Sequence, residues 1–291
     1  MSKIAFIGLG IMGGPMAGHL VAAGHDVTGY DVVPAGLDKL KAAGGATAGS
    51  VAEAVRDKDI VITMLPQDEH VEAVFTEILE HAAKGTLYID FSTIAPKTSQ
   101  WTAAEGAKKG LRVLDAPVSG GETGAVNAAL SIMVGGSEED FQAAAPVFAA
   151  VGKTFELVGG NGSGQCVKAA NQLVVGGTYA LVAEAILLME NLGADAKKGL
   201  DVLAGGLAGS RILELKRESM LARNFVPGFR IDLHHKDMGI ILAAARQAEV
   251  AIPMGALTAQ LIQSARAMGY GSLDHSGLLR VLEVLSGKDE A

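Results

Sequence analysis

The chain has 291 residues, of which 49% are hydrophobic, 19% are charged and 4% are aromatic, and its formal net charge is -8. This composition predicts a folded protein with a sizeable core rather than a disordered one, and the length fits two domains. The negative charge offers no basic surface for phosphates, which argues against a nucleic-acid partner.

The single cysteine, Cys166, excludes an intramolecular disulfide and fits a reducing compartment. We expect it to be a small buried apolar residue rather than a nucleophile. A strand is expected to begin at Lys3, which leaves no room for a targeting segment, so we expect a cytoplasmic location. The most apolar stretch, 173–189, contains two glycines and Glu184 and is typical of a buried helix rather than a membrane span.

Short apolar runs alternate with helical patterns in the first half of the chain. The strands predicted from these runs cover residues 3–7, 27–30, 59–65, 86–90, 111–115, 129–135 and 154–158. A helix is expected over 12–23, where Gly24 is placed to end it. Strands that alternate with helices at this spacing predict a mainly parallel sheet covered by helices on both faces.

After Gly164 the pattern is helical throughout. We predict one long helix over 165–191 and then helices over 194–203, 210–221, 231–248, 255–268 and 275–285. The glycine-rich segment 159–162 marks the boundary. We therefore expect a doubly wound α/β domain over 1–162, joined by the long helix to an all-α domain over 163–291.

The segment after the first strand has the pattern G-x-G-x-x-G, formed by Gly8, Gly10 and Gly13 with Ile11 and Met12 between the last two. Gly8 suits a tight turn, Gly10 lets the backbone approach a pyrophosphate, and Gly13 lets the helix pack on its strand. Free N–H groups at the helix start then hold the phosphates. The alternative is a plain strand-to-helix turn, but the flanking strand and helix favour a dinucleotide-binding Rossmann domain.

Asp31 ends the second strand, where a carboxylate accepts hydrogen bonds from the adenosine ribose. It repels a 2′-phosphate, and no arginine follows, so we expect NAD rather than NADP, although NADP is not excluded. The alternative role for Asp31 is a helix cap or turn residue. Leu65 and Pro66 after the third strand, and Ser92 and Thr93 after the fourth, are expected to border the same crevice.

Two further segments carry chemistry. The turn Ser119-Gly120-Gly121 exposes successive N–H groups, which suit a carboxylate or phosphate, although such a segment is more often a plain turn. In the long helix, Lys168, Asn171 and Gln172 share one face. A lysine in a partly dry cleft is a proton donor, whereas the alternative is a lysine that extends to solvent.

Lys236 and Asp237 begin the apolar part of a later helix, directly after His234 and His235. Adjacent histidines do not share a helix face, and no matching ligand pair is found elsewhere in the sequence. We therefore expect hydrogen-bonded or solvated histidines and no metal site.

Together these motifs resemble the β-hydroxyacid dehydrogenase family, which includes 3-hydroxyisobutyrate dehydrogenases, tartronate semialdehyde reductases and glyoxylate reductases. The resemblance rests on GLGIMGGPM from Gly8, MLP from Met64, FSTIAP from Phe91, DAPVSGG from Asp115, MVGG from Met133, GSGQCVKAANQ from Gly162 and KD at Lys236. The forms KAANQ, GGLAGS and RNFVPGFRIDLHHKD are most similar to the tartronate semialdehyde reductase branch. One departure is the segment Ala128-Ala129-Leu130, where the family usually has G-T-L.

The resemblance implies a role for each site residue. Lys168 corresponds to the catalytic lysine, and Ser119, Gly120 and Gly121 to the loop that binds the substrate carboxylate. Asn171 corresponds to a substrate-orienting amide, Lys236 to a residue beside the nicotinamide, and Thr93 to a cofactor contact. The resemblance also implies that the domain over 163–291 serves substrate binding and oligomerisation, with a homodimer or homotetramer expected.

The activity implied is reduction of tartronate semialdehyde to glycerate. Alternatives are a related enzyme acting on glyoxylate, succinic semialdehyde or 3-hydroxyisobutyrate; an imine reductase, a group that commonly lacks the lysine; a non-catalytic dinucleotide-binding protein; and a structural oligomer.

Overall fold

The computed structural model describes residues 1–288. Contacts divide the chain into two units, Met1–Lys168 and Ala169–Ala291, and the division falls inside helix α8, Ser163–Asn191. The domain boundary expected from the glycine-rich segment lies slightly earlier, at the start of α8, and stays a prediction.

The first unit contains a nine-stranded sheet in which the chain winds outward in both directions from β1. Its strands are β1 Lys3–Ile7, β2 Asp26–Tyr30, β3 Ala46–Thr47, β4 Ile60–Thr63, β5 Leu87–Asp90, β6 Arg112–Asp115, β7 Val118–Ser119, β8 Leu130–Gly135 and β9 Gly152–Gly159. The order is β3-β2-β1-β4-β5-β6-β8-β7, and β9 pairs with β8. The pairs from β3 to β6 are parallel, whereas β8 runs antiparallel to β6 and β7.

The ends of the central strands lie side by side. Thr63 is in register with Ile7 on one side and with Asp90 on the other, and Asp90 is in register with Asp115. The strand order reverses between β1 and β4, which is where doubly wound sheets bind ligands, outside the carboxyl ends of the strands. The turns after β1, β4, β5 and β6 therefore share one edge of the sheet.

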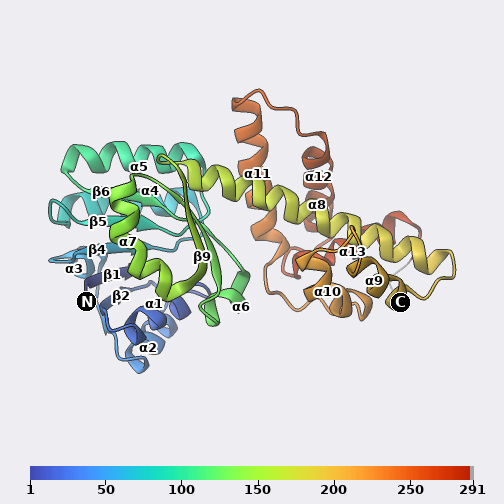
Figure 1. Cartoon of the computed structure of the whole chain (residues 1–291), viewed down its shortest axis with the longest axis horizontal. Coiled ribbons are helices and arrows are strands. Elements are labelled where there is room, and N and C mark those ends of the chain that lie inside the picture. The colour runs from blue at the N-terminus through green and yellow to red at the C-terminus, as the bar shows by residue number, and fades with distance from the viewer. Residues whose placement is uncertain (289–291) are drawn as a thin grey trace. The chain divides into compact units, whose positions relative to one another are not determined.

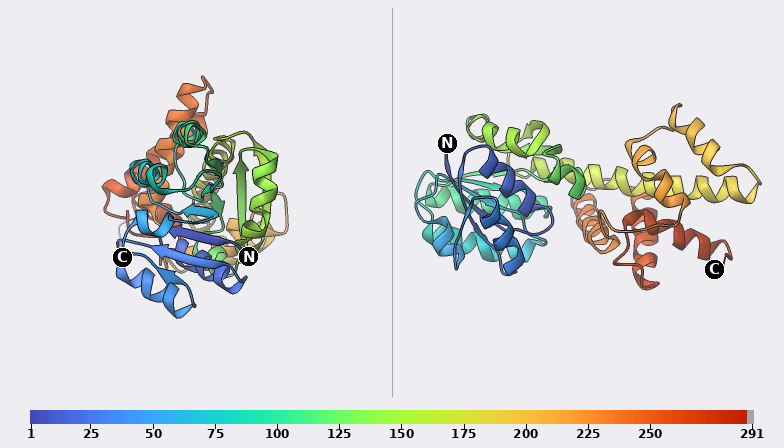
Figure 2. Two further views of the ribbon diagram at one scale, coloured as in Figure 1. Left: turned by 90° about the vertical axis from the view of Figure 1, so that its left-hand side faces the viewer. Right: turned by 90° about the horizontal axis from the view of Figure 1, so that it is seen from below.

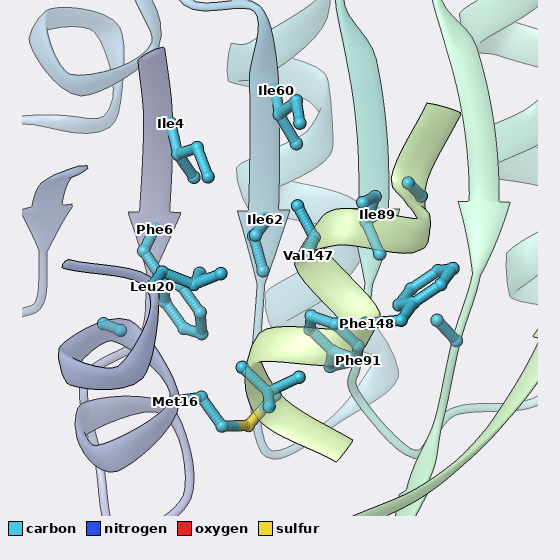
Figure 3. Packing of buried hydrophobic residues seen from close by; sticks show 14 of the residues in the cluster. Ile4, Phe6, Met16, Leu20, Ile60, Ile62, Ile89, Phe91, Val147 and Phe148 are labelled. Atoms are coloured by element: carbon cyan, nitrogen blue, oxygen red, sulfur yellow. The ribbon is translucent and has the colours of Figure 1, made fainter. Parts of the chain in front are cut away.

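Helices cover both faces of this sheet (Figures 1 and 2). One face packs against α1 Gly13–Ala22, α2 Pro34–Ala42 and α7 Glu138–Val151, and the other against α3 Val51–Val55, α4 Asp68–His81 and α5 Pro96–Lys109. Alternation along β1 explains both layers: Ile4 and Phe6 meet the first set, and Ala5 and Ile7 meet the second. Figure 3 shows Met16, Leu20, Val147 and Phe148 packed over the strands in the first layer.

The predicted α/β fold class is confirmed, and each predicted strand is present with ends that differ by a few residues. Three short elements lie outside the prediction: β3, β7 and the six-residue helix α6, Gly121–Val126. They are too short to show a periodic pattern. The strands β3 and β7 pair with β2 and β8, and α6 packs against α1 and β8.

The second unit is helical, as predicted. It contains most of α8, followed by α9 Ala196–Ala204, α10 Arg211–Leu221, α11 Ile231–Gln247, α12 Pro253–Ala267, the 3₁₀ helix His275–Gly277 and α13 Leu278–Leu285. Its core includes Ile186, Leu213, Ile231, Ile262 and Leu279, all at most 2% exposed. On length and composition α8 is apolar enough to cross a membrane, and 44% of its most apolar stretch is buried inside the protein.

A buried carboxylate organises the loops of the second unit. Asp274 is 1% exposed and pairs with Lys216 at 2.9 Å. Its Oδ2 accepts hydrogen bonds from the backbone N–H groups of Gly228 and Phe229 at 2.8 and 3.2 Å. Its Oδ1 also accepts a bond from the hydroxyl of Ser276 at 2.6 Å. Burial alone raises the pKa of Asp274, but His275, Ser276 and Lys216 outweigh burial and lower it to about 2.

We predict that Asp274→Asn lowers the free energy of unfolding at pH 7 by about 1–3 kcal/mol, because a buried ion pair loses one charge. The stabilisation by Asp274 is present above pH 4 and is lost as the pH falls through 2, so the difference between the proteins shrinks in acid. Urea unfolding at several pH values measures it. The control is Asp201→Asn, which removes a half-exposed partner of Arg217 and should change stability little. Equal losses in the two variants would contradict the role of Asp274.

Candidate active site

The glycine turn after β1 has two tightly packed positions and one open position. A Cβ atom at Gly13 would lie 1.9 Å from the carbonyl oxygen of Gly8, and one at Gly8 would lie 2.4 Å from that of Met64. A Cβ atom at Gly10 would meet nothing within 4 Å. The first and third glycines are thus required by the protein itself, whereas the open side of Gly10 fits the close approach of a ligand.

Asp31 fixes this turn to the end of β2. Its Oδ2 accepts a hydrogen bond from the N–H of Leu9 at 2.6 Å, and its Oδ1 accepts one from Val33 at 2.7 Å. A carboxylate oxygen has a second lone pair, so both oxygens retain acceptor capacity for a further donor. Ile11 is 59% exposed on the same turn, and Met12 is half-buried.

The turns after β4 and β5 are joined to each other. The N–H of Leu65 donates to the hydroxyl of Ser92 at 2.8 Å, and the N–H of Ser92 donates to Oδ1 of Asp90 at 3.0 Å. The hydroxyl of Thr63 donates to the same oxygen at 2.8 Å. Pro66 and Thr93 thus belong to turns whose neighbouring backbone is held by hydrogen bonds.

Asp90 lies beneath these turns and is 2% exposed. Burial raises its pKa to about 6, although hydrogen bonds from Ser92 and Thr63 act in the opposite direction. Within residues 1–288, its Oδ2 is buried without a hydrogen-bond partner. The environment therefore favours the neutral acid more than is usual for an aspartate.

Lys168 lies beside the turn expected to bind a carboxylate. Its ammonium donates to the carbonyl oxygen of Val118 at 2.7 Å, and the residue is 6% exposed. Val118 and Ser119 form β7, and Gly120 and Gly121 follow with φ values of 138° and 60°, which favour glycine. The alternative of a lysine that extends to solvent is wrong, because the sheet edge covers this face of α8.

The second unit brings together the other predicted side chains. The amide nitrogen of Asn171 donates to Oε1 of Gln172 at 2.8 Å, and Nε2 of Gln172 donates to Oδ2 of Asp237 at 2.6 Å. Lys236 pairs with the other oxygen of Asp237 at 3.1 Å. Asn171 and Lys236 are thereby linked through two buried side chains to which the sequence had assigned no role.

The histidines beside Lys236 make hydrogen bonds within the protein. Nε2 of His234 lies 3.2 Å from the carbonyl oxygen of Gln172, and its Nδ1 lies 3.2 Å from Nδ1 of His275. His235 lies 2.5 Å from Oε1 of Gln263. These contacts fit the expectation of hydrogen-bonded histidines.

The expectation that Cys166 is buried is wrong, since the residue is exposed. Gln165 and Lys168 point into the protein, and Cys166 and Val167 lie on the uncovered side of the helix. Partial burial of the thiol and the nearby charge of Asp115 raise the pKa of Cys166, which disfavours the thiolate.

Sequence reasoning missed two residues that hold Lys168 and the turns in place. Asp115 accepts hydrogen bonds from the N–H groups of Gly162 and Gln165 at 2.6 and 3.1 Å. The side chain of Gln165 bonds to the backbone of Ser92 and Ile94. The available signal was a polar residue at the end of an apolar strand and another in the first turn of an apolar helix.

Two family models together cover almost the whole chain. Residues 3–160 match the NAD binding domain of 6-phosphogluconate dehydrogenase, and residues 162–282 match the model described as NAD-binding of NADP-dependent 3-hydroxyisobutyrate dehydrogenase. These matches agree with the glycine turn at the switch point of the sheet.

The similarity to known proteins extends over nearly the full length of the chain. The chain is 40% identical to 2-hydroxy-3-oxopropionate reductase of Escherichia coli (strain K12), covering 98% of each chain. It is 36% identical to 2-(hydroxymethyl)glutarate dehydrogenase of Eubacterium barkeri, covering 98% of this chain and 96% of the relative. The structure of Mycobacterium tuberculosis 3-hydroxyisobutyrate dehydrogenase with L-serine has a TM-score of 0.90 at 36% identity and covers 97% of this chain and 99% of that one. The chain therefore belongs to the β-hydroxyacid dehydrogenase family and is an NAD(P)-dependent hydroxyacid dehydrogenase.

Proposed function

We propose that this enzyme reduces tartronate semialdehyde (2-hydroxy-3-oxopropionate) to glycerate, with Lys168 as general acid. The observation that carries the chemistry is the burial of the Lys168 ammonium beside the Ser119 turn, in the unit that also contains the glycine motif. The identity of 40% to the reductase of that name supports the choice of substrate.

The residues of the first unit fit a bound dinucleotide. The open side of Gly10 leaves space for a pyrophosphate, and the N–H groups of Ile11, Met12 and Gly13 at the start of α1 suit its charge. Leu65, Pro66 and Thr93 would hold its nicotinamide half, and Lys236 is proposed to lie beside the ring. When bound, the reduced cofactor supplies the hydride.

Lys168 donates the proton in the reduction and accepts it in the reverse reaction. As the carbonyl carbon accepts hydride, its oxygen gains negative charge, and a protonated lysine both stabilises that charge and donates the proton. In the reverse reaction the neutral amine removes the proton from the hydroxyl. The bond to the carbonyl oxygen of Val118 fixes the direction of the ammonium before substrate binds.

The remaining predicted residues orient the substrate. The N–H groups and hydroxyl of Ser119, Gly120 and Gly121 are proposed to bind the carboxylate, which sets the carbonyl carbon in one geometry. Asn171, whose amide is fixed by Gln172, is proposed to orient the substrate oxygen atoms.

We further propose that the enzyme prefers NAD to NADP. Asp31 retains acceptor capacity on both oxygens, which suits ribose hydroxyls. The neighbouring side chains, Val32 and Val33, are 83% and 56% exposed and carry no charge to accommodate a 2′-phosphate.

Self-association is proposed to use α8. Val174, Leu181 and Leu188 are 67%, 57% and 62% exposed and recur every seven residues, as in helices that pack along one another. Because a second copy presents the same stripe, a homodimer or homotetramer would bury it.

A cytoplasmic location is also proposed, and the single cysteine fits a reducing compartment.

We predict that tartronate semialdehyde gives the highest kcat/KM in a panel that includes glyoxylate, succinic semialdehyde and methylmalonate semialdehyde, and that NADH is used better than NADPH. Lys168→Ala should lower kcat by about 10²–10⁴-fold, the range for loss of a positioned general acid, while still binding NADH. Initial rates measure kcat and kcat/KM for each aldehyde and cofactor, and fluorescence titration measures NADH binding.

Lys168→Arg serves as the matched variant, because arginine retains the positive charge but does not release its proton between pH 6 and pH 9. Its kcat should stay as low as that of Lys168→Ala across this pH range. Undiminished turnover in Lys168→Ala would remove the lysine from the mechanism. A different preferred aldehyde would keep Lys168 and change the substrate.

Two glycine variants separate cofactor contact from packing. Gly10→Ala should leave the melting temperature nearly unchanged and weaken NADH binding, because its methyl group enters the open side of the turn. Gly13→Ala should lower the melting temperature, because its methyl group would overlap the carbonyl of Gly8. Normal NADH affinity in Gly10→Ala would place the pyrophosphate elsewhere.

The oligomer prediction is tested by sedimentation. Leu181→Glu should lower the mass of the particle, because equivalent charges would face each other across a symmetric interface. The matched control is Leu207→Glu, at a fully exposed leucine between α9 and α10. A wild-type monomer at micromolar concentration, or an equal effect of both variants, would contradict the assignment of α8.

A further inference from the structure

The side chain of Gln165 spans the turn that contains Thr93. Its Nε2 donates to the carbonyl oxygen of Ser92 at 2.8 Å, and its Oε1 accepts from the N–H of Ile94 at 3.2 Å. Gln165 is 1% exposed. The two bonds therefore hold the backbone on both sides of Thr93, which limits where its side chain can point.

The same turn is connected to the one that follows β4. The hydroxyl of Ser92 accepts a hydrogen bond from the N–H of Leu65 at 2.8 Å, and the N–H of Ser92 donates to Asp90 at 3.0 Å. A displacement of the backbone at Ser92 is thus passed on to the Leu65-Pro66 turn. Gln165 fixes two of the turns proposed to hold the nicotinamide half.

Gln165 is itself fixed in the first turn of α8. Its N–H donates to Oδ2 of Asp115 at 3.1 Å, and the N–H of Gly162 donates to Oδ1 at 2.6 Å. Lys168 follows one turn later on the same side of the helix, with its ammonium bonded to Val118. One short rigid segment therefore carries both the amide that holds the Thr93 turn and the proposed acid.

We propose that Gln165 is a positioning residue that sets the distance between the Thr93 turn, which holds the nicotinamide, and the ammonium of Lys168. This inference rests on the proposed function. Gln165 touches neither reacting atom in this role. It acts by fixing two groups that must meet the same carbonyl, one on the side of the hydride and one on the side of the proton.

Removal of the amide has a defined physical effect. The carbonyl of Ser92 and the N–H of Ile94 are left buried without partners, which is unfavourable, so the turn shifts to find new ones. A displacement of about 1 Å between reacting groups can cost about 10²-fold in rate. The main effect should therefore be on the rate of hydride transfer, and the effect on the free energy of unfolding should be smaller.

The decisive variants are Gln165→Met, which keeps the shape and removes both bonds, and Gln165→Glu, which keeps one acceptor. Gln165→Met should lower kcat by about 10-fold to 100-fold and weaken NADH binding by about tenfold. Its hydride-transfer step should become more rate-limiting, seen as a larger isotope effect with NADH deuterated at the transferred position. The control pair is Gln142→Met and Gln142→Glu, at an exposed glutamine of α7.

The Gln165→Glu variant provides a readout that a merely structural residue would not give. When the new carboxyl group is ionised it repels the carbonyl of Ser92, whereas the protonated acid donates to that carbonyl and restores both bonds. Burial favours the protonated form, so the ratio of the variant's kcat to that of the wild type should rise as the pH falls from about 8.5 to about 5.5. Asp90, Asp115 and Lys168 face the same region in both proteins, and division by the wild-type kcat removes the pH dependence that the two proteins share.

The outcomes are distinct. The aldehyde used is the one that the wild type reduces fastest; if it reduces none, the proposed function fails, and the NADH affinities alone decide whether Gln165 holds the turn. Unchanged kcat and NADH affinity in Gln165→Met would overturn the inference. A lowered melting temperature with a pH-independent ratio for Gln165→Glu would also overturn it, because it indicates packing alone.

Discussion

The carboxylate of Asp115 is the constraint on which the first unit's site depends. It ends β6, is 2% exposed, and accepts the first N–H groups of α8. A buried carboxylate is unfavourable unless it is hydrogen-bonded, and a helix N-terminus supplies both donors and a favourable dipole. Burial raises the pKa of Asp115, and the backbone hydrogen bonds from Gly162 and Gln165 oppose this rise without cancelling it. The helix that carries Lys168 therefore begins at one fixed point on the sheet edge.

The register of the sheet explains why the other polar groups gather at the same edge. Thr63, Asp90 and Asp115 are consecutive across three strands, so the turns that follow them are neighbours. The two carboxylates differ in their surroundings. Asp115 receives N–H donors from a helix start, whereas Asp90 is buried enough for its pKa to reach about 6. Hydrogen bonds from the backbone and from Thr63 to these two carboxylates therefore hold the edge.

Much of this architecture could be predicted because it depends on local patterns in the sequence. Apolar runs and helical periodicity predicted the strands and helices, and the glycine motif predicted the tight turn between β1 and α1, whose role in cofactor binding stays a prediction. The contacts that hold the site could not be predicted in this way. Gln165 bonds to a residue 73 positions earlier, and Asp115 to one 47 positions later, and no local pattern encodes such a pairing. Cys166 failed for a related reason, since the burial of a helix face depends on what packs against it.

The sequence departs from the family pattern at Ala128, and the structure shows which part of the backbone this departure affects. Ala128 has a φ of 50°, in the left-handed region where glycine is favoured and alanine costs about 1 kcal/mol. The segment nevertheless keeps its course, because the N–H of Ala129 donates to the carbonyl oxygen of Gly124 at 2.8 Å and Leu130 is fully buried. Leu130 packs beside Gly120 and Gly124, so it still supports the turn that is proposed to bind the substrate carboxylate.

The cost at Ala128 therefore falls on the stability of the backbone that follows α6, while Leu130 packs beside Gly120. Relatives with other named substrates share 36% identity with this chain over nearly its full length. Discrimination among aldehydes that differ by a methylene group requires only about 1–3 kcal/mol. Contacts of that size arise from individual side chains around a shared framework.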